Sequence, residues 1–352
     1  MSEKNEKKEI VANVGGQAVI EGVMMKSQDS VAIAVRRESG EIVTTTKKHI
    51  AWKDKHKALN IPVLRGVVNF IDMMKLSMAT LTESMEMVGF DEEPEEEQKT
   101  TKTGERIEAT EKTEEQKKTD TSKMIGIASA IGIVLGIGLS FVLFIFLPTF
   151  LGERFQSFAY TQWDHSLNPA VISTFEAVLR LVIFFVYILL VSQMKDIRRT
   201  FEYHGAEHMA IRAYECGEDL IVENVRKHSR FHPRCGTSFI IVMILISVLV
   251  GMIIPQGLWF RVLIRFSLFP LVIGIGYEFI RLAGKHSGNP LVKIIAAPGM
   301  WFQRLTTKKP DDSQLEVAIK SLKIALKLEM VEPVETGEII EVGEGIAHES
   351  DS

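Results

Sequence analysis

Two histidines and a glutamate stand in a spacing that suits a metal ion. His204, Glu207 and His208 form the pattern H-x-x-E-H. On a helix, residues four apart share one face, so both imidazoles can reach one ion. The carboxylate beside the second histidine can hold or deprotonate a metal-bound water, an order of groups known from one zinc-enzyme motif. The pattern predicts a divalent metal, zinc in the first instance, with Glu207 as the catalytic base.

The flanking sequence indicates that this motif lies on a helix. Gly217 is a suitable residue to end it, because glycine accepts the left-handed conformation that often follows a helix. Gly205 weakens the helix by about 1 kcal/mol. The alternative interpretation is a pair of surface histidines that contact lipid headgroups or Glu202.

A second group of possible ligands follows in the same polar segment. It contains His228, His232 and Cys235, and His232 or Cys235 is predicted to complete a tetrahedral site. Glu215 and Glu278 are alternative third ligands. Two other interpretations stay open: Cys235 as a catalytic nucleophile activated by a histidine, or a basic segment that binds anionic lipid.

Long apolar runs flank these residues and predict a mainly α, polytopic membrane protein. About four transmembrane helices are expected, at residues 124–147, 170–193, 237–254 and 258–282. Glu176 and Arg180 lie four residues apart in the second run, so they can pair on a face turned toward the bundle. A bundle-lining role for these residues and Glu278 would suit a non-enzymatic scaffold or a small transporter with a structural metal clip.

The distribution of lysine and arginine orients these helices. The segment 195–236 carries eight basic residues, whereas the segment 148–169, predicted as a loop, carries only Arg154. The positive-inside rule then places both termini and the histidine-rich segment in the cytoplasm of a multi-pass inner (plasma) membrane protein. Thiols stay reduced there, so Cys216 and Cys235 are not expected to form a disulfide.

The remaining segments are predicted to be elements outside the membrane spans and linkers. Residues 13–60 are predicted as a small β-containing cytosolic unit, with a hairpin in SVAIAVRR-ESGE-IVTTTKKHI and tight turns in GGQAVIEGVMM. Residues 61–90 are predicted as an amphipathic helix, either interfacial or packed on the bundle. Residues 283–328 are predicted as a cytosolic segment whose helix is capped by Asp312 or Ser313. Disorder is predicted for residues 1–12, for the linker 91–123 and for the tail 329–352.

Partners are predicted only in general terms. The first residues lack the apolar core of a cleavable signal peptide, so none is expected. The lipid bilayer and an unknown substrate are the expected partners. No nucleic acid is expected, and association of several copies stays open.

Five stretches carry a resemblance to a known family: GGQAVIEGVMM, FEYHGAEH, HPRCGTSF, GIGYEF and WFQRLTTKKPDDSQLEVAI. Together, and in this order, they resemble the YqhQ-like bacterial membrane proteins, a family defined by a domain of unknown function. The resemblance covers most of residues 13–325. It implies an integral membrane protein in which His204, Glu207 and His208 are metal-site residues of a predicted metal-dependent enzyme. It implies no particular substrate.

Overall fold

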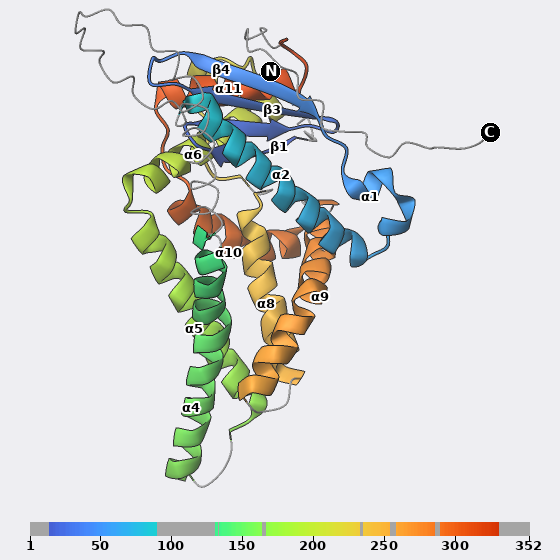
Figure 1. The fold of residues 1–352 in the computed structure, drawn as a ribbon, viewed down its shortest axis with the longest axis vertical. Helices are drawn as coiled ribbons and strands as arrows, with labels where there is room; N and C mark the ends of the chain where they lie inside the picture. The colour runs from blue at the N-terminus through green and yellow to red at the C-terminus, as the bar shows by residue number, and fades with distance from the viewer. Residues whose placement is uncertain are drawn as a thin grey trace, which may run out of the picture.

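A computed structural model describes residues 14–89, 131–132, 134–163, 167–232, 235–253, 258–285 and 289–330. The predictions for residues 1–12 and 91–123, and for all of the tail 329–352 beyond its first two residues, lie outside these ranges; Glu329 at the start of the tail forms an ion pair with Lys320. Most of the described chain is helical, and one small antiparallel sheet lies near the N-terminus, as predicted. Figure 1 shows this sheet stacked at one end of a group of long helices.

The N-terminal unit is an antiparallel sheet with the strand order β1-β2-β3-β4. Its strands are β1 (Gly15–Val19), β2 (Gly22–Lys26), β3 (Ser30–Arg36) and β4 (Ile42–Lys48). The predicted hairpin is confirmed as the β3–β4 pair. The glycine-rich stretch before it, predicted only as tight turns, forms a second hairpin from β1 and β2. Glu21 in its turn has a φ of 49°.

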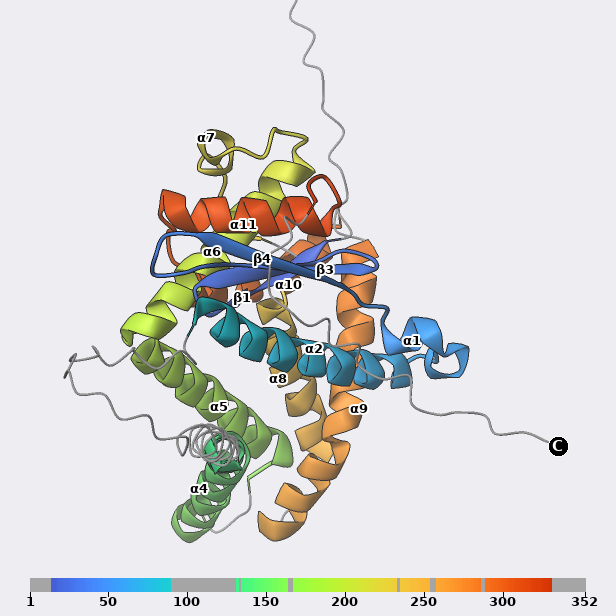
Figure 2. The same cartoon turned by 45° about the horizontal axis from the view of Figure 1, so that its top comes forward.

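Both faces of the sheet are buried, which explains why β2 and β3 are almost continuously apolar. On one face, Met25 and Ala32 pack against α6 (Lys195–Glu215) and α11 (Asp312–Ala325). On the other face, their neighbours in the strands pack against α2 (Leu64–Val88). Side chains alternate across a strand, so each strand contributes to both cores. Figure 2 shows the sheet between α6 and α11 on one side and α2 on the other.

Helix α2 joins the sheet to the apolar helices. Two short helices precede it, α1 (Trp52–Lys55) and a 3-10 turn, Lys57–Leu59. Near its start, Gly66 meets α9 (Leu258–Lys285) so closely that an added Cβ would lie 3.0 Å from the Cα of Gly274. Arg65 there forms an ion pair with Glu278. The helix therefore packs on the bundle, while Ile71, Met74 and Met78 leave an exposed apolar stripe on its other side.

In the part of the chain that the structure describes, three helices are long and apolar enough to cross a membrane: Val134–Gln162, Pro169–Val191 and Val262–Leu282. The first contains a π-helical turn, Val142–Phe146, and α4 (Leu147–Trp163), the second is α5 and the third lies in α9. The third predicted span, 237–254, corresponds to α8 (Thr237–Ile253), whose apolar part Val242–Gly251 is shorter than these three helices, so the predicted count of four is not confirmed.

The predicted end of the first span at Leu147 is wrong, because the helix continues to Trp163 and residues 148–163 are not a loop. Pro148 suggests a break in the sequence, since proline removes a backbone donor. In the structure it is the second residue after the π-helical turn, a place where an α-helix departs from its regular hydrogen bonding.

The predicted pair inside the second span is confirmed. Arg180 Nη2 lies 3.6 Å from Glu176 Oε2, and both side chains are buried in the bundle. Arg265 of α9 also pairs with Glu176 and donates to Thr149 Oγ1 at 2.6 Å. Arg180 Nε donates to the carbonyl of Phe144, within the π-helical turn, at 3.0 Å. These charges connect α4, α5 and α9.

Helix α10 (Pro290–Thr306) lies between the sheet and the apolar helices (Figure 1). The short α7 (Val222–Val225) follows α6. Helix α11 begins after Asp311, so the predicted cap at Asp312 or Ser313 is wrong. Asp311 accepts from Gln314 N at 2.9 Å, and the Gln314 side chain accepts from Asp311 N at 3.0 Å. This reciprocal capping box satisfies two donors at once, which favours Asp311.

Candidate metal centre

Helix α6 places His204 and His208 on one face, as the spacing predicts. Each ring is oriented by a backbone carbonyl: His204 Nδ1 lies 2.9 Å from Thr306 O, and His208 Nδ1 lies 2.6 Å from Arg230 O. A carbonyl only accepts hydrogen bonds, so each Nδ1 carries the proton. Both Nε2 atoms keep a lone pair, which is the arrangement that metal-bound histidines show.

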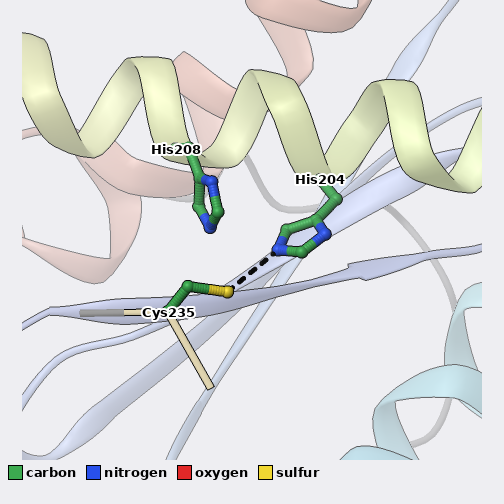
Figure 3. A group of neighbouring side chains, drawn as sticks. All are labelled: His204, His208 and Cys235. Carbon is green, nitrogen blue, oxygen red and sulfur yellow. Dashed lines mark hydrogen bonds between the residues drawn. The ribbon is translucent and has the colours of Figure 1, made fainter. Parts of the chain in front are cut away.

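The side chain of Cys235 lies opposite the two histidines (Figure 3). Its Sγ is 3.4 Å from His204 Nε2, and the ligand atoms of His204, His208 and Cys235 all lie within 4.8 Å of one another. In tetrahedral zinc sites, bonds of about 2.3 Å to sulfur and about 2.0 Å to nitrogen place neighbouring ligand atoms roughly 3.5 Å apart. Among the described residues, this is the one group of three such side chains with ligand atoms so close.

Glu207 lies beside this group, with Oε2 3.9 Å from His204 Nε2 and only 5% of the residue exposed. The backbone N–H of Gly16 in β1 donates to its carboxylate. A Cβ at residue 16 would lie 2.8 Å from Glu207 Cγ and 2.8 Å from Met24 O. The strand can approach the carboxylate this closely only because glycine has no side chain.

Burial shifts the proton affinity of two groups in the centre. It raises the pKa of Glu207, and His204, His232 and the Gly16 N–H oppose this rise. A carboxylate with a raised pKa is suited to take up and return a proton near neutral pH. Burial also lowers the pKa of His208, an effect that the neighbouring Cys235 opposes. A lowered pKa favours the neutral imidazole that metal binding requires.

His232 is held apart from the three ligand atoms. Its Nε2 lies 3.1 Å from Glu215 Oε2 in a buried pair, and its ring centroid is 5.7 Å from that of His208. Gln303 of α10 fixes its backbone, accepting from His232 N at 2.8 Å and donating to His232 O at 2.8 Å. Of the two residues predicted to complete the site, the structure brings Cys235 to the motif and pairs His232 with Glu215.

The other candidate ligands are engaged elsewhere. His228 Nε2 lies 3.2 Å from Glu218 Oε2. Glu278 pairs with Arg65 at the crossing of α2 and α9. Within the described residues, neither Cys216 nor Cys235 is part of a disulfide. The structure therefore brings three of the candidate ligands together, His204, His208 and Cys235, and places the others in separate contacts.

Three participants were not predicted from the sequence: Gly16, Gln303 and Thr306. Each acts through the backbone or on a backbone group, so its side-chain type gives little warning. The available signal was their position in GGQAVIEGVMM and WFQRLTTKK, two of the stretches that carry the family resemblance. The close packing of Gly205 was also not predicted from the sequence. Its Cα faces the segment after α10, where an added Cβ would lie 2.2 Å from Lys308 O.

Comparison with known proteins gives a family and no activity. Residues 61–328 match the family model described as "Protein of unknown function (DUF1385)". The chain is 36% identical over 324 residues to the "Uncharacterized protein YqhQ" of Bacillus subtilis (strain 168). That alignment covers 90% of this chain and 92% of the relative. No solved structure matches the chain.

Proposed function

This chain belongs to the DUF1385 family, and we propose that it is a multi-pass inner-membrane protein with a zinc-type hydrolytic centre at the cytoplasmic face. The observation that carries the proposal is the convergence of two Nε2 atoms and one Sγ within 4.8 Å. Both Nδ1 atoms are held by backbone carbonyls, so the rings are already turned toward a common point. Three protein ligands leave a fourth position open, as catalytic zinc sites do.

Each residue of the centre has a distinct part in this proposal. His204, His208 and Cys235 bind the metal. A zinc ion held there would supply Lewis-acid chemistry and make a bound water acidic near neutral pH. Glu207 takes the proton of the water as it adds to the substrate and returns it to the leaving oxygen or nitrogen. Gly16 keeps the Glu207 carboxylate in place through its backbone N–H.

Membrane insertion is supported by the exposed surface of the apolar helices. Leu190, Leu249, Leu263 and Phe266 are each more than 60% exposed, on α5, α8 and α9. Apolar side chains gathered in this way in long helices favour lipid as their surroundings. The basic residues of segment 195–236 favour placing the metal centre on the cytoplasmic side.

A non-enzymatic scaffold or small transporter is the second candidate, and one observation favours it. The buried cluster of Glu176, Arg180 and Arg265 lies inside helices apolar enough to span a membrane, where ionisable side chains often serve function. In that case the metal would be a structural clip. A closed, four-ligand coordination would identify a clip, and a water-accessible position would identify a catalytic metal.

Metal analysis of the purified protein tests the metal centre. We expect one zinc or similar divalent ion per chain, lost in His204→Ala and in His208→Ala. Cys235→Ser should weaken binding, because a hydroxyl is a poor ligand for a soft metal. The thiolate-to-metal absorption band of the cobalt(II) form should also disappear in that variant. His228→Ala is the matched control and should keep the metal, because His228 is engaged with Glu218.

The variant Glu207→Gln tests whether Glu207 acts as a base or as a metal ligand. The amide keeps the size of the side chain but cannot take a proton, so the variant should bind metal and lack hydrolytic activity. Metal that remains after loss of both His204 and His208 would refute the centre. Metal lost in Glu207→Gln would make Glu207 a ligand instead of a base.

A further inference from the structure

The candidate metal centre lies where the apolar helices end. Cys235 stands two residues before the start of α8 at Thr237. On the opposite side, Thr306 of α10 holds His204, and Phe302 of the same helix stacks on Phe184 of α5 at 5.0 Å between ring centroids. The centre is therefore anchored through short connections to two of the apolar helices.

An exposed tryptophan marks the level of the membrane surface beside this centre. Trp301 is 54% exposed, and its ring lies edge-on to Phe185 at 5.7 Å. Tryptophan is enriched at membrane–water interfaces. Trp301 stands five positions before Thr306, a rise of about 7.5 Å along a helix. If the apolar helices span a bilayer, the centre lies in or next to the headgroup layer.

The two segments beside the centre are strongly basic. Residues 192–204 and 297–310 lie against each other, and Lys308 N donates to Phe201 O at 2.8 Å. They contain six basic residues, Lys195, Arg198, Arg199, Arg304, Lys308 and Lys309, and two acidic ones, Asp196 and Glu202.

Three of these basic residues are exposed and form no ion pair within the described residues. Arg199 pairs with Glu21, and Arg198 lies 3.5 Å from Glu202. Lys195, Arg304 and Lys309 are exposed and form no ion pair with any residue in the described part of the chain. Cations at the headgroup level favour anionic lipids, by about 1 kcal/mol each near the surface.

We propose that the polar group that reaches this metal centre is the phosphate-bearing headgroup of an anionic lipid, held at the membrane surface by Lys195, Arg304 and Lys309. The inference rests on the proposed metal centre and gives it a substrate class. The lipid chains stay in the bilayer beside α5 and α10, and only the headgroup comes near His204, His208 and Cys235. Charge complementarity selects the anionic headgroup, and the position of Trp301 selects a membrane source over a soluble one.

The test uses the full chain, loaded with cobalt(II), in phosphatidylcholine vesicles that contain a minor fraction of phosphatidylglycerol. Phosphorus NMR then measures how strongly the paramagnetic ion relaxes each lipid. We expect selective relaxation of phosphatidylglycerol. The preference should fall about fivefold for each cation removed at low ionic strength, in Lys195→Gln, Arg304→Gln and Lys309→Gln and in their combination.

A matched variant removes equal charge at a distance from the centre. Lys48, Lys55 and Lys57 are exposed on β4, on α1 and in the 3-10 turn that follows it, and form no ion pair within the described residues; their combined change to glutamine should leave the lipid preference intact. Equal relaxation of both lipids by cobalt-loaded protein would overturn the inference and leave the metal centre standing. Equal relaxation of soluble glycerophosphate would overturn the lipid source. Failure to bind cobalt would instead refute the proposed function, and it is seen separately in the metal content.

Discussion

Replacing Gly16 by alanine tests whether β1 positions the proposed base. The added methyl group would lie 2.8 Å from Glu207 Cγ, 2.9 Å from Glu207 Cδ and 2.8 Å from Met24 O. The Met24 carbonyl belongs to the backbone of β2, which is paired on both sides and cannot yield easily. The Glu207 side chain must therefore move and give up its hydrogen bond from the Gly16 N–H.

The expected loss of folding stability in Gly16→Ala follows from two opposing effects. Overpacking of a buried site typically costs about 1–3 kcal/mol. Alanine recovers about 0.5–1 kcal/mol in a strand, because it loses less conformational freedom on folding than glycine. Gly16→Ala should therefore destabilise the protein by about 1–2 kcal/mol. Gly15→Ala is the adjacent control: no atom lies within 4 Å of an added Cβ there, so stability should stay equal or rise slightly.

Denaturant titration of the metal-free protein in detergent, followed by tryptophan fluorescence, measures both variants. Combining Gly16→Ala with Glu207→Ala completes a double-mutant cycle. Truncation of Glu207 makes room for the new methyl group, so we expect a coupling energy of about 1 kcal/mol or more. An unchanged Gly16→Ala penalty in the Glu207→Ala background would refute the contact. Metal content should be preserved in Gly16→Ala, because Glu207 is not a ligand.

Three further outcomes are expected. Gly205→Ala should destabilise the protein by about 2 kcal/mol in the same titration, since its Cβ would lie 2.2 Å from the Lys308 backbone oxygen, and overpacking of about 3 kcal/mol outweighs the gain of about 1 kcal/mol in helix propensity. The raised pKa of Glu207 means that the folded metal-free protein binds this proton more tightly than the unfolded chain, whose value is near 4.5. Stability should therefore fall as the pH rises from about that value through the folded pKa, and Glu207→Gln should remove this part of the slope. Reporter domains inserted after Gln162 and after Glu218 should report opposite sides of the membrane, and an exterior signal from both would contradict a cytoplasmic metal centre.

Features set by local spacing were predictable from the sequence. The pairing of Glu176 with Arg180 and the common face of His204 and His208 both follow from the helical repeat. The end of α6 was equally predictable, and Gly217, which follows it, has the left-handed φ of +66°. The β3–β4 hairpin followed from two β-rich runs joined by a short turn. These predictions depend on residues at most a few positions apart, where chain geometry leaves few alternatives.

Contacts between residues far apart in the sequence were not predictable in the same way. His232 and Cys235 stand at similar distances from the motif along the chain, and both are good zinc ligands. The structure separates them through Gln303, which is 71 residues from His232 and fixes its backbone, and through Glu215, which pairs with its ring. Residue types do not reveal these long-range contacts. The end of the first apolar helix was missed for another reason, because the helix continues past Pro148, a residue type that usually interrupts helices.

The centre is assembled from parts of the chain with different structural attachments. Helix α6 supplies two candidate ligands, Cys235 leads into the apolar α8, and Thr306 of α10 orients His204. The proposed base is held separately, because Gly16 belongs to a sheet whose other face is covered by α2. A disturbance of the apolar helices would therefore act first on metal binding, whereas a disturbance of the sheet would act first on the base. Since α2 also packs on α9, it links the two disturbances, because it touches both the sheet and the bundle.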